Sequence, residues 1–337
     1  MAQTNYPHGN VDRTDWVRCV GNAYQICGTR HYALTRGFSR GVNAIDVRTG
    51  GGLEYTIVPD RGLDISLASY QGNNLTYLTP KGEMNPAFYD ASGEGWIRTF
   101  FAGLLTTCGF ENVGAGCEDE GRYFGQHGRQ NIIPAKNVCD CSNGTGGIHI
   151  HGELEDSVCF GAKIRRERTI VSACGENWIR ITDIFENYGS KDEPLLLLYH
   201  INFGYPFLNK QTRVRIDAVK TEPYNAYSAE DMARLFEFSE PDATLQEKNY
   251  FHVLADSSGY GCSEIRNPNG TGVCIRQKMD ELPYLNHWKL ENPVDYVLAL
   301  EPSNVRCVGR RAMREAGGLP VIRAGEKKKF EIEIRVI

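Results

Sequence analysis

The chain has 337 residues and a formal net charge of −5, so it is long enough for a large hydrophobic core. The mild negative charge provides no basic surface of the kind that binds nucleic acid. No run approaches the roughly 18 consecutive apolar residues of a membrane span, so we expect neither nucleic-acid nor membrane partners.

The first residues lack the basic and apolar pattern of a secretory signal, and the eleven cysteines are odd in number and scattered. We therefore expect reduced thiols in a cytoplasmic protein. A secreted protein with disulfides is the competing interpretation, and the missing signal argues against it.

Short runs rich in Val, Ile, Tyr and Thr, separated by many of the 36 glycines and 14 prolines, predict strands along the whole chain. The clearest runs are residues 54–58, 178–187, 213–216, 272–276 and 330–336. One short helix is expected within 230–238, and strands and helices do not alternate. These patterns predict an all-β protein, a large twisted antiparallel β-sandwich. We expect a single domain over residues 1–337, with 1–30 as an N-terminal extension packed on it.

Two arginines stand in distinctive settings early in the chain. Arg61, within Val58-Pro59-Asp60-Arg61-Gly62-Leu63-Asp64-Ile65, could grip sugar hydroxyls or a carboxylate with its planar fork. A solvated turn with an Arg–Asp pair is the alternative. Arg98 is the one cation in an apolar, glycine-containing stretch, residues 96–109, and a buried arginine needs a partner from the protein or a ligand.

Several histidines follow. His127 lies between glycines, where a ligand could approach the backbone closely, although a turn histidine bound to a carbonyl is equally simple. His149 and His151 share one strand face, which suits a metal, but the sequence supplies no third ligand. Residues 139–141, a C-x-C, are too closely spaced for the usual zinc or redox pattern. We expect no metal, and two surface histidines on a strand.

The most informative segment is residues 195–208, an apolar run in which His200 and Asn202 appear one strand period apart. Side chains at i and i+2 lie on the same face of a strand, and a histidine there can carry protons near neutral pH. Trp288 could offer a flat ring to a sugar or pack in the core. Glu301 ends an apolar strand, where partial burial would raise its pKa toward that of a useful base.

The chain lacks a G-x-S-x-G elbow, a P-loop and a G-x-G-x-x-G motif after a strand. A hydrolase that works through serine or cysteine is therefore disfavoured.

Taken in order, five motifs resemble a branch of the aldose 1-epimerase (galactose mutarotase-like) superfamily. They are residues 59–65, 103–109, 126–129, 198–206 and 300–302. The resemblance extends from about residue 30 to the end. It implies the twisted β-sandwich already predicted, with a sugar held in a cleft of one sheet.

The resemblance also implies roles for particular residues. His200, protonated, would be the catalytic acid, Glu301 the base, His127 a sugar ligand and Arg98 a contact to sugar hydroxyls. Asn202 and Phe203 follow the acid as in mutarotases. Arg61 belongs to the branch's own motif.

Two departures from the mutarotase pattern concern the substrate. Arg129 stands where mutarotases have a second glycine, and no substrate-binding aspartate can be placed between acid and base. Arg129 and Lys289 together would favour an acidic, oxidised or phosphorylated sugar, unless either is paired with a carboxylate of the protein.

The resemblance thus implies an isomerase of carbohydrate metabolism that interconverts sugar anomers by general acid–base ring opening. It implies no metal or organic cofactor, a small carbohydrate as partner, and a monomer or homodimer. The alternatives are a sugar-binding protein without turnover, and a sugar isomerase or lyase on the same scaffold.

Overall fold

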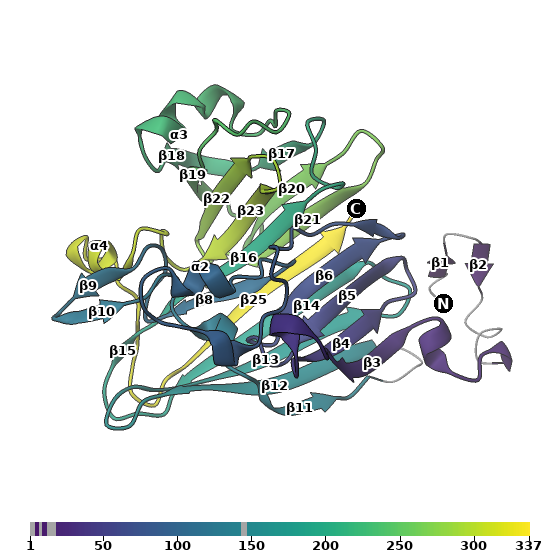
Figure 1. The fold of residues 1–337 in the computed structure, drawn as a ribbon, viewed down its shortest axis with the longest axis horizontal. Coiled ribbons are helices and arrows are strands. Elements are labelled where there is room, and N and C mark those ends of the chain that lie inside the picture. Colours follow the sequence, from purple (N-terminus) through teal and green to yellow (C-terminus); the bar gives the residue numbers. More distant parts are fainter. Residues whose placement is uncertain (1–3, 7–8, 12–17, 143–146) are drawn as a thin grey trace.

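The computed structural model describes residues 4–6, 9–11, 18–142 and 147–337. Two layers of antiparallel strands lie face to face (Figure 1). The strands of the N-terminal quarter, drawn purple to blue, lie in front of the teal strands of the larger sheet. The predicted class, an all-β antiparallel sandwich, is confirmed.

One layer is a single sheet of eight strands, and neighbouring strands in it are antiparallel. In sheet order these are β11 (Lys136–Asp140), β12 (Gly147–Ser157), β13 (Lys163–Ala173), β14 (Trp178–Asn187), β25 (Lys327–Val336), β21 (Gly272–Lys278), β20 (Tyr260–Arg266) and β17 (Arg213–Ile216). We call it the large sheet.

The facing layer consists of two sheets that adjoin where Ile65 bridges Leu105. The six-stranded sheet has the order β18 (Ala218–Pro223), β19 (Lys248–Leu254), β22 (Tyr284–Glu291), β23 (Tyr296–Ser303), β16 (Leu196–Gly204) and β8 (Thr106–Phe110). The five-stranded sheet has the order β3 (Gly28–Ala33), β4 (Asn43–Arg48), β5 (Leu53–Val58), β6 (Asp64–Tyr70) and β7 (Asn73–Asn74).

The remaining elements are short. Three two-stranded pairs are β1 (Thr4–Tyr6) with β2 (Gly9–Val11), β9 (Cys117–Asp119) with β10 (Arg122–Phe124), and β15 (Glu193–Pro194) with β24 (Val321–Ile322). Three α-helices lie wholly within the described ranges: α2 (Gly95–Thr99), α3 (Ala226–Glu230) and α4 (Arg310–Glu315). The 3₁₀ turns are η1 (Ala23–Gln25), η2 (Gly37–Ser39), η3 (Pro86–Phe88), η4 (Gln130–Ile132) and η5 (Met232–Arg234). In the described part of the chain, no helix has the length and apolar character needed to cross a membrane.

The helix predicted within 230–238 is displaced. Helix α3 ends at Glu230, and in the described structure the turn η5 follows it. At the start of the helix, the Asn225 side chain is the N-cap and accepts a hydrogen bond from the Ser228 amide. The cap therefore fixes an earlier start than the apolar pattern suggests.

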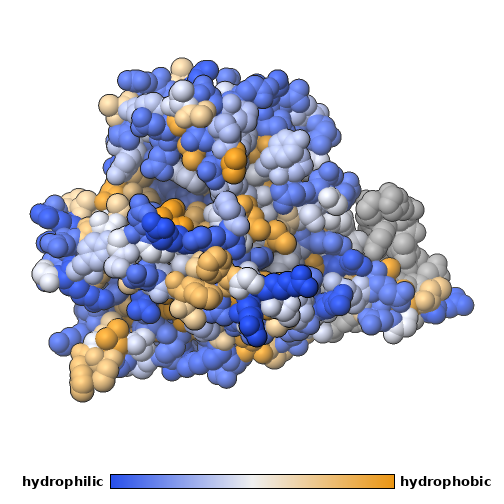
Figure 2. Space-filling view, viewed as in Figure 1, coloured by the Kyte–Doolittle hydropathy of each residue, from blue (hydrophilic) through white to orange (hydrophobic). Residues whose placement is uncertain are grey.

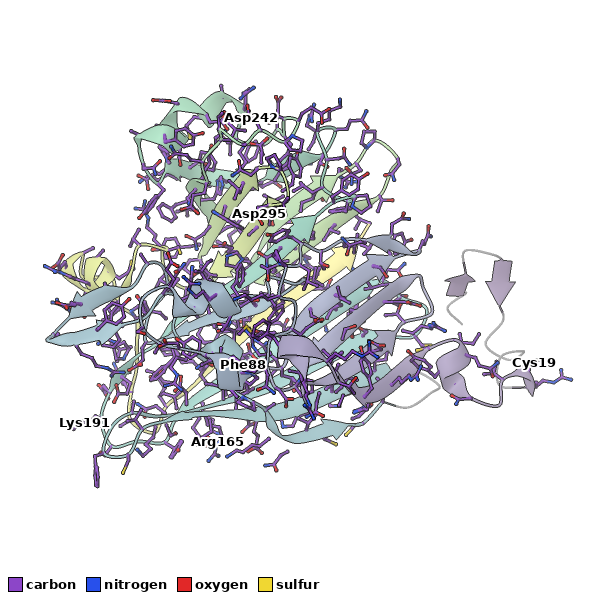
Figure 3. The ribbon with its side chains drawn as sticks, in the orientation of Figure 1. Cys19, Phe88, Arg165, Lys191, Asp242 and Asp295 are labelled. Carbon is purple, nitrogen blue, oxygen red and sulfur yellow. The ribbon has the colours of Figure 1, made fainter. Side chains whose placement is uncertain are left out.

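Strict alternation builds the core between the layers. Along β13 the side chains of Ile164, Arg166 and Arg168 are buried, while Arg165 lies on the outer face and is labelled at the lower margin of Figure 3. One large apolar cluster extends through all three main sheets. In the described part of the N-terminal segment, Val20, Ala23 and Ile26 pack against it.

A fully buried ionic network crosses between the layers. The Arg168 guanidinium on β13 donates to both carboxylate oxygens of Asp183 on β14, at 2.8 and 2.6 Å, and to Asp64 on β6 at 2.5 Å. Thr107 on β8 and Tyr199 on β16 complete the network, the tyrosine hydroxyl donating to Asp183 at 2.7 Å. Strands β8 and β16, which flank the site described below, are thus tied to the opposite layer.

Candidate active site

Strand β16 carries His200 on the face of the six-stranded sheet that looks away from the large sheet. Its odd-numbered residues, such as Tyr199 and Ile201, pack in the main core. Its even-numbered residues face a second, smaller apolar cluster that includes Leu198, Trp96 and Phe100. The predicted shared face of His200 and Asn202 follows from this alternation.

Glu301 lies opposite His200 on the neighbouring strand. Leu198 pairs with Ser303 and Ile201 with Leu300, and these pairs set the register between β16 and β23. His200 Nε2 and Glu301 Oε1 are 3.1 Å apart, and both side chains are buried. Thr106 on β8 is opposite His200, and Asn286 on β22 is opposite Glu301, so the four residues form one row across the strands.

The two groups of this pair have pKa values shifted in opposite directions. Burial raises the pKa of Glu301 to about 8, and the negative charge of Glu247 adds to the shift. Burial also lowers the pKa of His200 to about 3, with repulsion from His127 adding to it and the Asn202 side chain opposing it. At neutral pH the pair therefore holds one proton, and that proton is on Glu301.

Aromatic rings surround the pair. Phe100 and Trp288 lie 5.1 and 5.7 Å from the His200 ring, measured between centroids, and His127 lies 5.9 Å from it. Trp96 lies 4.6 Å from His127. Figure 2 shows a recess in this face of the molecule, between the upper lobe that carries α3 and the region of α2. Such rings suit the apolar face of a sugar.

His127 is brought to the site by a strained turn. It has a φ of 54°, and its ring Nδ1 accepts from the Gly114 amide at 3.4 Å. Gly128 has a φ of 68°, and a Cβ there would lie 2.2 Å from the Gly109 carbonyl oxygen, so only glycine fits. Burial lowers the pKa of His127 to about 4, which keeps its imidazole neutral.

Four polar side-chain atoms of the site have no hydrogen-bond partner among the described residues. They are His200 Nδ1, Asn202 Oδ1, Trp96 Nε1 and Asn286 Nδ2. A buried polar atom left unpaired costs about 1–3 kcal/mol. His200 and Asn286 flank Glu301 in the same row across the strands, and their unpaired atoms indicate a place where a polar ligand completes the bonds.

Two residues of the site escape sequence reasoning. Glu247, in the loop before β19, accepts a hydrogen bond from the Trp288 indole at 2.9 Å. Asn286 pairs with Glu301 across the strands and accepts from the Cys307 amide at 3.0 Å. Glu247 is a carboxylate between acid and base in the chain, the position for which sequence motifs supply no candidate.

Comparison with known proteins agrees with this architecture. The model of a family described as "Domain of unknown function (DUF4432)" matches residues 39–336. The chain belongs to this family. No curated protein matches the chain.

Solved structures match nearly the whole DUF4432 chain. A Klebsiella pneumoniae protein named a "putative aldose 1-epimerase" superposes with a TM-score of 0.85 at 20% identity, covering 93% of this chain and 88% of that one. A galactose mutarotase-like protein from Clostridium acetobutylicum superposes with a TM-score of 0.62 at 13% identity, covering 93% of this chain and 99% of that one. Galactose 1-epimerase from Lactobacillus acidophilus superposes with a TM-score of 0.62 at 11% identity, covering 92% of this chain and 99% of that one. The fold is galactose mutarotase-like, as the motifs predict.

Arg61 does not face the site in this DUF4432 protein. Its side chain is fully buried and donates to the carbonyl oxygens of Asn131, Met84 and Thr99 at 2.9, 2.6 and 2.8 Å. Both interpretations from sequence, a sugar ligand and a solvated turn, are contradicted by these contacts. The motif is structural, since the guanidinium joins η4, the segment that contains Met84 and the end of α2.

Arg98 and Arg129 lie at the surface. Arg98 occupies the solvent side of α2, opposite Trp96 and Phe100, and pairs with Glu94 at 2.9 Å. The expected contact of Arg98 with sugar hydroxyls is not supported by this position, because the helical turn directs the side chain to solvent. Arg129 is exposed at the start of η4, and neither arginine contacts the His200–Glu301 pair in the described structure.

Lys289 points to the opposite side of β22 from Trp288. It is buried and pairs with Asp231 at 3.1 Å and with Glu291 at 3.6 Å, in a cluster that also contains Lys248. Adjacent residues of a strand cannot face one cleft, so Lys289 is not a substrate ligand. The inference of an acidic sugar therefore loses one of its two cations.

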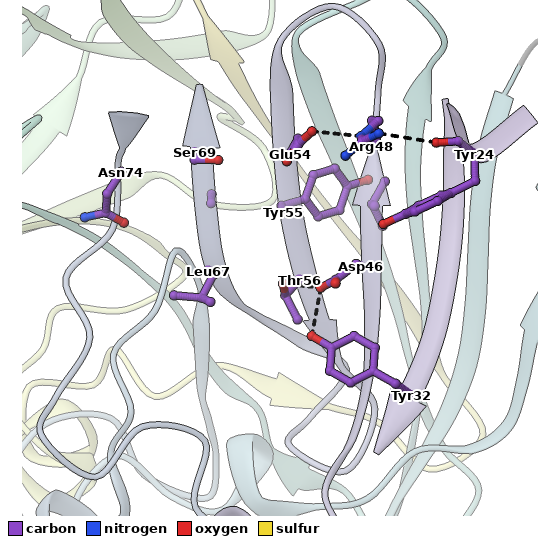
Figure 4. Close-up of a pocket in the computed structure, with 12 residues that line it drawn as sticks. Tyr24, Tyr32, Asp46, Arg48, Glu54, Tyr55, Thr56, Leu67, Ser69 and Asn74 are labelled. Carbon is purple, nitrogen blue, oxygen red and sulfur yellow. Dashed lines mark hydrogen bonds and ion pairs between the residues drawn. The ribbon is translucent and has the colours of Figure 1, made fainter. Parts of the chain in front are cut away.

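A separate hollow of about 430 Å³ lies over the outer side chains of β4, β5 and β6 (Figure 4). Asp46 there accepts from the Tyr32 and Thr56 hydroxyls at 2.8 and 2.7 Å, and Arg48 pairs with Glu54 at 2.9 Å. The charged groups of this hollow are thus already paired with protein groups.

Replacing Glu247 by glutamine is expected to lower the pKa of Glu301, since it removes a negative charge and keeps an acceptor for the Trp288 indole. The carboxyl carbon of Glu301 can be titrated directly by ¹³C NMR. Glu186→Gln, on the outer face of β14, is the matched control and should leave that titration unchanged. An identical Glu301 titration in Glu247→Gln and the wild type would show that Glu247 does not act on the pair.

Proposed function

We propose that this protein is an aldose 1-epimerase, which interconverts the anomers of a sugar by opening and closing its ring. The observation that supports this most is the His200–Glu301 pair, two proton-carrying groups 3.1 Å apart with opposite pKa shifts. Groups whose environments separate their pKa values are suited to acid–base chemistry.

The pair can carry out both proton transfers that the reaction needs. Opening the hemiacetal removes a proton from the anomeric hydroxyl and supplies one to the ring oxygen, and both oxygens are bonded to the same carbon. In the ionic form of the pair, Glu301 takes the first proton while protonated His200 gives the second, and the bond between C1 and the ring oxygen breaks. The pair is then neutral, with Glu301 protonated.

Ring closure reverses these transfers after the aldehyde has rotated about C1–C2. Protonated Glu301 returns a proton to the carbonyl oxygen and His200 removes the proton from the hydroxyl that attacks C1. The neutral pair favoured by burial is therefore the form that accompanies the open sugar. One proton passes between the two residues through the substrate, and each transfer contributes about 10²–10⁴-fold.

The surroundings support a neutral aldose as the substrate. Glu247 accepts from an indole rather than from a cation, so its negative field extends to the site. Arg306, near Asn286 over the Phe251 ring, is paired with Glu222 at 3.3 Å. Trp288 and Trp96 offer apolar faces, while Asn286 and His127 offer polar atoms to hydroxyl groups. The proposed chemistry needs no metal or organic cofactor.

Freshly dissolved α-anomers of neutral aldoses, uronic acids and sugar phosphates, followed by NMR saturation transfer, test the proposal. We expect the purified protein to accelerate anomer exchange of at least one neutral aldose. Arg98→Ala, on the solvent side of α2, should exchange the sugar as fast as the wild type.

Other outcomes distinguish the alternatives. Line broadening of a sugar without faster exchange would instead indicate a binding protein without turnover. Incorporation of solvent deuterium into a sugar C–H would indicate an isomerase or lyase, because mutarotation breaks no C–H bond. Either result would contradict the proposal.

A further inference from the structure

Two short motifs that are separate in the sequence meet in the structure. In the β11–β12 pair, Cys139 is directly opposite His151. The Cys141 amide donates to the His149 carbonyl at 2.9 Å, so these two residues are neighbours across the same pair of strands. Strand pairing therefore supplies the further ligands that the H-x-H motif lacks in sequence.

All four side chains lie on one face of this pair. Residues i and i+2 of a strand share a face, as do residues directly opposite on antiparallel strands, whose Cβ atoms lie about 4.5–5.5 Å apart. The intervening Asp140 and Ile150 point to the other side, where Asp140 accepts from Thr29 and lies 2.8 Å from His31 Nε2. The face with the thiols and imidazoles is outward, and three of its four side chains are exposed.

We propose that Cys139, Cys141, His149 and His151 form a binding site for a zinc-like divalent cation at the edge of the large sheet. The thiol sulfur atoms are neighbours, 2.9 Å apart, and they would separate to about 3.8 Å as ligands of one tetrahedral ion. Two thiolates and two imidazoles are a donor set that suits tetrahedral Zn²⁺, with bonds of about 2.3 Å to sulfur and 2.0–2.1 Å to nitrogen. In the structure the imidazole nitrogens are not yet gathered with the two sulfurs, so the site forms by rotation of side chains that are mostly exposed.

A neighbouring strand orients one of the ligands. Thr169 on β13 is paired with His151, and its hydroxyl oxygen lies 3.3 Å from His151 Nδ1. With Nδ1–H donating to this hydroxyl, Nε2 keeps its lone pair for the metal. Metal-bound histidines commonly make such a bond through their second nitrogen.

The site is distinct from the proposed sugar site, which lies in the six-stranded sheet. Binding replaces one proton on each thiol by a bond to the ion, so two protons are released per ion at a pH where both thiols are protonated. A second group, Cys262, Glu264 and Cys274, has ligand atoms within 4.8 Å of one another on β20 and β21. It is a rival for the same ion, and one Glu264 oxygen is bonded to Arg266 at 2.9 Å.

Titration of the reduced, metal-free protein with Co²⁺ tests the site. We expect one ion per chain, with thiolate-to-cobalt charge-transfer absorption and the intense visible bands of tetrahedral cobalt, both displaced by Zn²⁺. The double variant Cys139→Ser/Cys141→Ser should lose the charge-transfer band. Cys262→Ser/Cys274→Ser is the matched control and should keep it.

Further variants examine the histidines. His149→Ala/His151→Ala should lose the tetrahedral bands, and it serves as the test if the serine variant does not fold by far-UV circular dichroism. Thr169→Val should weaken binding about 10–100-fold, the usual effect of removing such a positioning partner. No thiolate band in the wild type, or a band lost only in the Cys262/Cys274 variant, would overturn the proposal.

Discussion

Replacing Glu301 by glutamine is expected to abolish anomer exchange while leaving most of the affinity for the sugar. Glutamine has the shape of glutamate and can keep a hydrogen bond to His200, but it cannot give or take the proton. Loss of one general acid–base group lowers a rate about 10²–10⁴-fold. Because Glu301 is 3% exposed, water has little access to replace it.

Exchange rates by NMR at saturating sugar and affinities by isothermal titration calorimetry measure the two effects separately. A large loss of rate with affinity retained would identify Glu301 as a catalytic residue. Arg98→Ala should change neither quantity. Retention of the wild-type rate in Glu301→Gln would contradict the mechanism, whatever happened to the affinity.

The same pair predicts the pH dependence of the wild-type rate. Catalysis needs one proton on the pair, and the alkaline limit is set by its loss from Glu301, whose pKa burial raises to about 8. The rate should therefore fall as pH rises through about 8. The acid limit is the pKa of His200, which burial lowers to about 3, so the rate should not decline between about pH 5 and 7.

Local alternation makes part of this site predictable from sequence. The apolar run before His200 fixes a buried strand, and the period of two places His200 and Asn202 on one face. The same rule separates Trp288 from Lys289, which sequence reasoning wrongly assigned to one cleft. The helical spacing of Trp96 and Phe100 likewise places Arg98 on the opposite, solvent side.

The other features of the candidate site depend on pairing between segments that are distant in the sequence. The opposition of His200 and Glu301, like the position of Asn286, comes from the register of β16, β23 and β22, which no local pattern specifies. Glu247 lies in a loop before β19 and is linked to the site by its bond to Trp288 and by its charge, which acts on Glu301. Cys139 and His151 are opposite each other for the same non-local reason.

Burial of charge is the other feature that local patterns do not reveal. The charges of Asp60-Arg61-Gly62-Leu63-Asp64 are typical of a turn in sequence, yet Arg61 and Asp64 are fully buried. Their partners are carbonyl groups from other loops and Arg168 on β13. Gly62 has a φ of 69°, and a Cβ there would lie 2.7 Å from the Gln130 carbonyl oxygen, which explains the glycine.

Replacing Arg168 by methionine is expected to destabilise the fold by about 3–5 kcal/mol, the usual cost of breaking a buried ion pair. Methionine fills much of the volume but leaves the carboxylates of Asp64 and Asp183 without their cation. Unfolding in urea measures the loss. Arg165→Met is the matched control on the same strand, since Arg165 is part-exposed and its pairs with Glu155 and Glu186 are long, at 3.9 and 3.6 Å. We expect it to cost less than about 1 kcal/mol.

The pH dependence of this loss separates unpaired charge from a simple packing defect. Burial raises the pKa of Asp183, but in the wild type the charge and hydrogen bonds of Arg168 outweigh it and hold that pKa below 3.8. The stability from Asp183 is thus present above its unfolded pKa and is lost as pH falls through its folded value. Without Arg168, only the charge of Arg166 and the Tyr199 hydroxyl still oppose burial. The folded pKa of Asp183 therefore rises, so the variant gains stability as pH falls toward 4. The difference in the free energy of unfolding between the wild type and the variant should therefore shrink from pH 7 to pH 4. A difference that stays constant over this range would mean that lost packing, and not two unpaired carboxylates, limits the stability of the variant.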